Sequence, residues 1–264
     1  MSGGQGDNMK TVILCGGKGT RMREETEFKP KPLVEIGGMP ILWHIMKIYS
    51  HYGYNDFVLC LGYKGNMIKD YFLNFEWFSN DFTLSLGDGC RKTDIHTKSP
   101  VNWNITFANT GEETDTGGRV KKIEKYIDGN EFFLTYGDAV ADIDIRRLYN
   151  YHKVMGKMAT VTAVHPSSRF GVLEIDDKGI ARSFHEKPAV NGVINGGYFV
   201  LNREVFDHMD DNCNFEKDVL KEISQKGELA VYTDCKYWQC MDTYKEAEEF
   251  NKQWNNGHHP WVVW

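Results

Sequence analysis

Thr11-Val12-Ile13-Leu14-Cys15-Gly16-Gly17-Lys18-Gly19-Thr20-Arg21 joins an apolar run to a glycine-rich turn, and this junction predicts the fold class. The first four residues indicate a buried strand. Glycines lack a Cβ atom, so the backbone of the turn can approach a ligand closely and adopt positive φ angles. Successive N–H groups can then face one concavity and bind an anion. A strand that leads into such a turn is therefore typical of a phosphate site.

The turn differs from two well-known glycine-rich phosphate motifs. It has neither the spacing of a P-loop nor the pattern Gly-x-Gly-x-x-Gly. A turn that only reverses the chain would explain two adjacent glycines. Phosphate binding is favoured by the third glycine, by the planar guanidinium of Arg21 and by the following Lys29-Pro30-Lys31-Pro32.

Strand and helix patterns alternate after the turn. Pro40 suits a helix start, and apolar residues recur at helical spacing from Ile41 to Tyr52. The apolar run 57–62 is typical of a strand covered on both faces, and a helix is expected at about 66–75. This succession predicts an α/β fold with a mostly parallel sheet, whose ligand lies at the carboxyl ends of the strands.

Small β elements are expected outside this sheet. Residues 169–184 have the pattern of a hairpin around a turn at 176–179. Residues 81–86 are a candidate strand, whereas the polar residues 87–99 indicate an exposed loop or excursion. Residues 103–109 indicate a strand, and 215–226 indicate one amphipathic helix that ends before Gly227.

Two aspartates are candidate metal ligands. Asp138 follows the apolar run 132–136 through Gly137, so it stands at the carboxyl end of a predicted strand. A buried carboxylate is unfavourable unless it is paired or binds a cation, and Mg²⁺ is the natural partner beside phosphates. A turn aspartate is the alternative for Asp138, and a helix N-cap is the alternative for Asp242. Asp144 is expected to cap the helix Ile145 to Met155.

Lys29-Pro30-Lys31-Pro32-Leu33-Val34-Glu35-Ile36-Gly37-Gly38, followed by Pro40 to Met46, resembles the signature of sugar-phosphate nucleotidylyltransferases, in particular the glucose-1-phosphate cytidylyltransferase branch. The similarity runs from about Met9 to the C-terminus. It implies a Rossmann-like nucleotidyltransferase fold, with a mixed, mostly parallel sheet flanked by helices and small β excursions. Relatives usually carry Gly-Asp-Gly where this chain has Gly137-Asp138-Ala139.

The reaction that the resemblance implies joins CTP and α-D-glucose 1-phosphate to give CDP-glucose and pyrophosphate. Such a product would supply the synthesis of deoxysugars or of O-antigen-type polysaccharides. The same chemistry with dTTP or UTP is one alternative, and a non-catalytic regulatory protein that binds sugar nucleotides is another.

The resemblance also implies roles for individual residues. Mg²⁺ is expected as the cofactor, on Asp138 and Asp242, while Arg21, Lys31 and Lys187 neutralise phosphate charge and complete the catalytic set. Glu186, Lys187, Asn195 and Gly196 are expected to bind the sugar phosphate. The acidic residues in the segment 110–119 would repel phosphates, so that loop is expected near the base and ribose of the nucleotide and not near its triphosphate. The expected nucleotide-binding residues are Leu14, Cys15, Gly16, Gly17, Lys18, Gly19, Thr20, Arg21, Lys31, Thr114, Arg119 and Gly137.

Composition excludes several classes of protein. The 264 residues carry a formal net charge of −6, which argues against a general nucleic-acid binder. No apolar run approaches the roughly 20 residues that cross a bilayer, and no signal-peptide pattern is present. The six cysteines show no Cys-x-x-Cys spacing, which favours a reducing cytoplasm.

The chain is expected to form a single domain after a short extension. Residues 1–8 are polar and glycine-rich, which indicates a disordered extension or a cloning remnant. Residues 9–264 form the predicted domain, with a nucleotide-binding part at about 9–140 and a sugar-phosphate-binding part at about 141–245, before a C-terminal helix and tail. The aromatic tail 258–264 is expected to pack on the domain or on another subunit. A homo-oligomer is expected, and a hexamer by resemblance.

Overall fold

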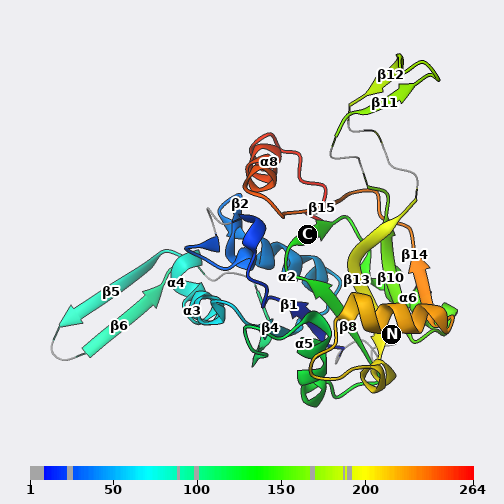
Figure 1. Cartoon of the computed structure of the whole chain (residues 1–264). Helices are drawn as coiled ribbons and strands as arrows, with labels where there is room; N and C mark the ends of the chain where they lie inside the picture. The colour runs from blue at the N-terminus through cyan, green and yellow to red at the C-terminus, as the bar shows by residue number, and fades with distance from the viewer. Residues whose placement is uncertain are drawn as a thin grey trace.

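The computed structural model of the chain describes residues 9–22, 26–87, 90–97, 101–166, 170–186, 188 and 192–264. The expected extension 1–8 and Lys187 lie outside these residues. Helices pack around a central sheet, and two hairpins, β5–β6 and β11–β12, project away from it (Figure 1). Within the described part of the chain, no helix is both long and apolar enough to cross a membrane.

A seven-stranded sheet forms the centre of the described structure, in the order β14-β10-β13-β8-β1-β4-β7. β13 runs antiparallel to both of its neighbours, and the other neighbouring strands are parallel. The expected mixed, mostly parallel sheet is therefore confirmed. Its strands are β1 (Thr11–Leu14), β4 (Asp56–Leu61), β7 (Asn104–Asn109), β8 (Glu131–Tyr136), β10 (Ala159–Val164), β13 (Ile194–Asn202) and β14 (Leu229–Tyr232).

Side chains that alternate along β1 fill a separate core on each face of the sheet. Ile13 packs in the core that contains α2 (Ile41–His51), and Val12 packs in the core that contains residues of α5 (Thr116–Lys122). Neither side chain is exposed to solvent. Burial on both faces explains why this strand is uniformly apolar in sequence.

The helices around the sheet begin at residues whose side chains suit a helix end. Asp144 caps α6, since its carboxylate accepts a hydrogen bond from the N–H of Arg147 at 3.0 Å, as expected. α8 begins after Thr243, not Asp242, and a capping box joins Thr243 to Glu246. Besides α2 and α5, the described α-helices are α3 (Gly65–Leu73), α4 (Phe75–Ser79), α6 (Ile145–Met155), α7 (Lys221–Gln225) and α8 (Tyr244–Asn255).

Four two-stranded sheets complete the described β structure. Of the two expectations for 87–99, an exposed loop or an excursion, the structure shows an excursion, because the segment contains the strand β6, which pairs antiparallel with β5 in a projecting hairpin. Polar residues are exposed along β6, so its sequence lacks the apolar alternation that predicts a strand. The pairs are β2 (Glu35–Ile36) with β3 (Met39–Pro40), β5 (Phe82–Gly87) with β6 (Cys90–Ile95), β9 (Ala139–Ala141) with β15 (Trp238–Cys240), and β11 (Val172–Ile175) with β12 (Ala181–His185).

The segment 215–226 also differs from the single amphipathic helix that we expect from its spacing. It starts with a π-helical turn, η5 (Phe215–Leu220), and continues as the short helix α7. The side chain of Asn214 accepts hydrogen bonds from the N–H groups of Glu216 and Lys217. Apolar spacing does not distinguish a π turn from an α turn over so few residues. The short turns η1 (Thr20–Met22), η2 (Lys31–Leu33), η3 (Glu124–Tyr126) and η4 (Arg203–His208) are 3₁₀-helical.

The aromatic tail packs on the domain itself. Trp261 is completely buried, and its ring lies against Phe250 and Tyr237 with centroid distances of 5.4 and 5.7 Å. Its indole Nε1 donates a hydrogen bond of 3.3 Å to His44. The tail was expected to pack either on its own domain or on another subunit, and in this structure it packs on its own chain.

Candidate active site

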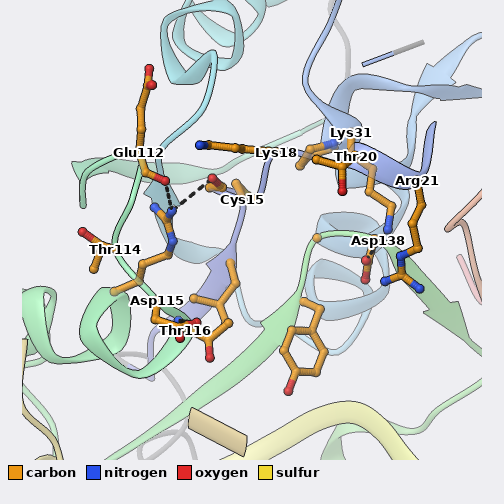
Figure 2. Close-up of a pocket in the computed structure, with 18 of the residues that line it drawn as sticks. Cys15, Lys18, Thr20, Arg21, Lys31, Glu112, Thr114, Asp115, Thr116 and Asp138 are labelled. Carbon is orange, nitrogen blue, oxygen red and sulfur yellow. Dashed lines mark hydrogen bonds and ion pairs between the residues drawn. The ribbon is translucent and has the colours of Figure 1, made fainter. Parts of the chain in front are cut away.

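A cavity of about 490 Å³ lies where β1 and β8 end. Its volume falls in the range of small-molecule sites. Every residue expected to bind nucleotide lines this cavity, and so do Asp138 and Asp242. Figure 2 shows Glu112 and Thr114 on one side of the cavity and Arg21 and Asp138 on the other.

The register of the sheet brings the first and third motifs together. Leu14 at the end of β1 pairs with Tyr136 at the end of β8. The N–H of Gly137 donates a 3.1 Å hydrogen bond to the carbonyl of Leu14. The glycine-rich turn and Asp138 thus leave neighbouring parallel strands at the same edge, which is where α/β sheets bind ligands.

The glycines of the first turn have different surroundings. A Cβ atom on Gly16 would lie 2.1 Å from Nη1 of Arg119, so this position has room only for glycine. A Cβ atom on Gly17 would meet nothing within 4 Å. Gly19 has a φ of +59°, which favours glycine. Gly17 is therefore the position at which the backbone faces open space that a phosphate can enter.

Gly137 has a structural reason that the sequence did not indicate. In the sequence, a glycine directly before a candidate metal ligand indicates close approach of a ligand. A Cβ atom here would lie 2.9 Å from the carbonyl oxygen of Leu14. Contact between the two strand ends therefore requires glycine, independently of any ligand.

Arg119 holds the first and second loops together. Its guanidinium donates to the carbonyls of Gly16 at 3.1 Å, Gly111 at 2.6 Å and Glu112 at 3.0 Å, and to the hydroxyl of Thr110 at 2.8 Å. The side chain is buried, and burial lowers its pKa below the usual value for arginine. These contacts position the backbone of both loops around the cavity.

The Gly-Gly pair at the start of α5 packs against another segment of the protein. The N–H of Gly118 donates to the carbonyl of Cys213 at 3.0 Å and is not free for a ligand. Cβ atoms on Gly117 and Gly118 would lie 2.4 Å from Sγ of Cys213 and 2.2 Å from the carbonyl oxygen of Asp211. These glycines therefore allow the chain near residue 212 to pack closely against the helix.

Lys31 joins the two aspartates predicted to bind metal. Its Nζ lies 2.6 Å from Oδ2 of Asp138 and 2.7 Å from Oδ1 of Asp242. Burial lowers the pKa of Lys31, but the two carboxylates outweigh burial and raise the pKa above its usual value. Nη1 of Arg21 lies 2.8 Å from the other oxygen of Asp242. Two anions and two cations thus form one cluster at the cavity wall.

Pairing between distant strands explains why the two aspartates meet. β9, which follows Asp138, pairs antiparallel with β15, which precedes Asp242. The N–H of Met241 also donates a 2.8 Å hydrogen bond to the carbonyl of Asp138. Because Thr243 caps α8, the carboxylate of Asp242 is directed to Lys31 and Arg21 instead.

Among the expected sugar-phosphate residues that the structure describes, Glu186, Asn195 and Gly196 do not line the cavity directly. Asn195 lies next to it, because its Nδ2 is 3.3 Å from the hydroxyl of Tyr136, which lines the cavity. The carbonyl of Gly196 accepts a 2.7 Å hydrogen bond from Trp238. Glu186 is exposed just after β12. Lys187 lies outside the described residues, so the roles of these four residues stay predictions.

Some cavity residues were missed in the sequence. Tyr136 directly precedes Gly137-Asp138, and its position at a strand end next to a candidate ligand was an available signal. Thr116 lies in the second motif, where its spacing alone did not distinguish it from a cap residue. Pro32 and Tyr136 line the cavity without an expected place in the sequence, whereas the segment 110–119, expected near the base and ribose, supplies the lining residues Glu112, Glu113, Asp115 and Thr116.

Several known proteins are similar to this chain over nearly its full length. A probable glucose-1-phosphate cytidylyltransferase from Bacillus subtilis (strain 168) is 50% identical over 259 residues, which cover 97% of this chain and 100% of that protein. A glucose-1-phosphate cytidylyltransferase from Salmonella typhi is 47% identical with the same coverage. The crystal structure of HddC from Yersinia pseudotuberculosis superposes with a TM-score of 0.67 at 25% identity, covering 93% of this chain and 99% of that chain.

The family model for nucleotidyl transferases matches residues 10–255, which include every residue that lines the cavity. The strand order, the glycine-rich turn after β1 and the paired aspartates lie within the matched region. On this match and on the nearly full-length similarity to cytidylyltransferases, the chain belongs to the nucleotidyl transferase family.

Proposed function

We propose that this protein transfers a cytidylyl group from CTP to α-D-glucose 1-phosphate and releases pyrophosphate. The observation that carries the proposal is the cluster of Lys31, Asp138, Asp242 and Arg21 on a cavity behind a glycine-rich turn. The choice of CTP and glucose 1-phosphate is supported by the 47–50% identity to glucose-1-phosphate cytidylyltransferases. That similarity does not favour dTTP, UTP or a non-catalytic regulatory role.

The reaction needs no nucleophile from the protein. A phosphate oxygen of the sugar phosphate forms the new bond to the α-phosphorus of CTP, and the bond from that phosphorus to the bridging oxygen of the β-phosphate breaks. Pyrophosphate leaves with the electron pair. Catalysis of this kind depends on positioning the two phosphates and on neutralising their charge. Backbone N–H groups of residues 16–20, with Arg21, are suited to the leaving pyrophosphate, and Lys31 and Lys187 are suited to the two reacting phosphates.

Asp138 and Asp242 have the donor chemistry that a magnesium ion requires. Both present carboxylate oxygens to one ammonium nitrogen, so the site already accommodates a cation between them. Among the described residues, no group of three or more His, Cys, Asp and Glu side chains could hold a metal ion. Mg²⁺ commonly binds through one or two carboxylates together with phosphates and water. When bound, it would supply Lewis-acid stabilisation of the α-phosphate.

A homo-oligomer, and a hexamer by resemblance, is part of the proposal. The hairpin β11–β12 exposes Leu173, Ile175 and Phe184, each about three-fifths or more accessible to solvent. Leu86 on β5 is 76% exposed. Apolar surface of this kind on projecting hairpins supports contact with another subunit. Light scattering coupled to size-exclusion chromatography would measure the mass, and a monomer would contradict this part.

A reducing cytoplasm is the proposed location, and deoxysugar or polysaccharide precursor synthesis is the proposed context. Support for the location comes from the free thiols of Cys15, Cys60, Cys213, Cys235 and Cys240 in the described structure. Labelling of thiols in protein from intact cells would test it, and disulfide-bonded cysteines would contradict it.

A turnover assay tests the proposed reaction. The protein is incubated with Mg²⁺, glucose 1-phosphate and one of CTP, dTTP, UTP or GTP, and pyrophosphate release is followed. We expect CTP to have the highest kcat/KM, with CDP-glucose as the product. Faster turnover with another nucleotide would change the assigned base, and no turnover with any of them would overturn the proposal.

A further inference from the structure

We propose that Glu216 is a positioning residue that locks the two walls of the cavity to each other. One wall is the nucleotide loop that starts α5, and the other is the end of β8 that carries Tyr136, Gly137 and Asp138. The inference rests on the proposed transfer reaction, because it assigns a task within that reaction. Glu216 lies outside the cavity lining, on the π-helical turn η5.

Each oxygen of the Glu216 carboxylate holds one wall. Oε1 accepts a 2.5 Å hydrogen bond from the hydroxyl of Tyr136, and Oε2 accepts a 2.8 Å hydrogen bond from the hydroxyl of Thr116. Tyr136 and Thr116 both line the cavity, and they come from different elements. Hydrogen bonds to an ionised acceptor are short and about twice as strong as those between neutral groups.

Tyr136 is confined so that its hydroxyl must face Glu216. The ring packs on Gly197, where a Cβ atom would lie 2.5 Å from the ring. Burial, and then the Glu216 carboxylate, raise the pKa of Tyr136 above its usual value. The hydroxyl therefore keeps its proton and donates a hydrogen bond to Glu216. The same hydroxyl accepts from Asn195, which extends the network to a residue expected at the sugar phosphate.

Thr116 is held equally firmly on the opposite wall. Its hydroxyl oxygen accepts a 3.0 Å hydrogen bond from the N–H of Phe215 while it donates to Glu216. Asn214 also donates to Asp115 at 3.1 Å, and Gly118 donates to Cys213 at 3.0 Å. The start of η5 is thus attached to the start of α5, and Glu216 extends that attachment to β8.

The chemical consequence concerns the distance between the nucleotide and the aspartates. A nucleotide whose base side lies on the loop at 112–116 must present its α-phosphate to Asp138, which belongs to the other wall. Misplacement of reacting groups by about 1 Å can lower a rate by about 100-fold. A carboxylate that holds both walls therefore acts on catalysis without contact with the substrate.

Kinetics of Glu216→Ala, Glu216→Gln and the matched control Glu222→Ala test the proposal. Glu222 lies on the neighbouring helix α7, where it pairs with Lys226 and His208 away from the cavity. We expect Glu216→Ala to lose about 10- to 100-fold in kcat/KM for both substrates, mainly through kcat. Glu216→Gln keeps one oxygen that can accept from Tyr136, and its amide N–H can donate a hydrogen bond to the hydroxyl oxygen of Thr116. This variant should therefore retain most of the wild-type activity. Glu222→Ala should match the wild type.

A double-mutant cycle distinguishes positioning from simple loss of stability. Tyr136→Phe and Thr116→Val each remove one of the two hydrogen bonds through which Glu216 connects the walls, so the double variant should lose no more activity than the worse single variant. Additive losses would overturn the proposal, as would Glu216→Ala with kcat/KM within twofold of the wild type. The cycle also decides the matter if Glu216→Ala fails to fold.

The outcomes for the network and for the proposed reaction are separable. A wild-type protein without activity on CTP and glucose 1-phosphate contradicts the proposed reaction. The variants are then compared with the wild type on whichever nucleoside triphosphate it uses. A kcat/KM of Glu216→Ala close to that of the wild type contradicts only the proposed role of Glu216.

Discussion

The pairs Gly16-Gly17 and Gly117-Gly118 look alike in sequence, but Gly17 and Gly118 have opposite surroundings. Gly16-Gly17 follow the strand β1, whereas Gly117-Gly118 lie in the first turn of the helix α5. A Cβ atom on Gly17 would meet nothing within 4 Å, whereas one on Gly118 would lie 2.2 Å from the carbonyl of Asp211. The first pair is here called the open turn, because Gly17 faces the cavity, and the second is called the closed turn, because Gly118 packs against another segment of the chain. Glycine in a loop indicates close approach, but only the partner tells whether a ligand or the protein approaches.

The largest effect is expected at Asp138, whose carboxylate lines the same cavity as the open turn. Asp138→Asn should lower kcat by about 1,000-fold, with a much smaller change in CTP affinity, because neutralisation of transition-state charge is lost. Steady-state kinetics and equilibrium binding of CTP would measure the two quantities. Asp128→Asn is the control, since Asp128 is largely exposed and does not line the cavity. Wild-type turnover of Asp138→Asn at saturating Mg²⁺ would remove the metal role.

The closed turn is expected to affect stability. Gly118→Ala forces a methyl group against the backbone of Asp211, so the free energy of unfolding should fall by about 1–3 kcal/mol. At an unconstrained helix position the same change would stabilise by up to about 1 kcal/mol, so the sign is informative. Urea denaturation followed by circular dichroism measures it. A more stable variant would show that this turn has room, and the contrast between the turns would fail.

The open turn is expected to affect binding. Gly17→Ala adds a methyl group in space that we assign to phosphate, so KM for CTP should rise about tenfold, equivalent to about 1.4 kcal/mol. The free energy of unfolding should stay close to the wild-type value, in contrast to Gly118→Ala. An unchanged KM together with lower stability would reverse the roles of the two turns.

The smallest effect concerns pH and lies outside both turns. Burial lowers the pKa of His44 to about 4, although hydrogen bonds to backbone carbonyls oppose this shift. An unfolded histidine has a pKa near 6.5, so between these values the unfolded chain binds a proton that the folded chain does not. Stability should therefore fall with falling pH, by about 1 kcal/mol from pH 6.5 to 5.5.

The variant His44→Gln isolates this effect, because the pKa of buried His152 is also lowered by burial and adds in the same direction. Urea denaturation at pH 6.5 and 5.5 should show a smaller loss of stability for His44→Gln than for the wild type. An equal loss would assign the acid sensitivity to other groups. Either result leaves the comparison of the two turns intact, because His44 packs with the C-terminal tail.

Local signals explain which predictions were confirmed. The apolar run at β1 and the cap at Asp144 depend on neighbours a few residues away, so the sequence displays them directly. β6 was missed because the hairpin stands away from the core and its polar residues are exposed. The two environments of the Gly-Gly pairs could not be distinguished, because the partner of Gly118 lies more than 90 residues away in the chain.

Side-chain periodicity and turn chemistry act over short distances, so local patterns predicted the strand that leads into a glycine turn, the carboxylate after Gly137 and the main alternation of strands and helices. The fold was needed to show that Asp138 and Asp242 share Lys31, since β9 and β15 pair across about 100 residues. The cap of α8 is local, because Thr243 and Glu246 form a Thr-x-x-Glu capping box, whereas the hydrogen bonds of Glu216 to Tyr136 and Thr116 join distant parts of the chain. Contacts between distant segments depend on packing and strand register, which no local pattern encodes.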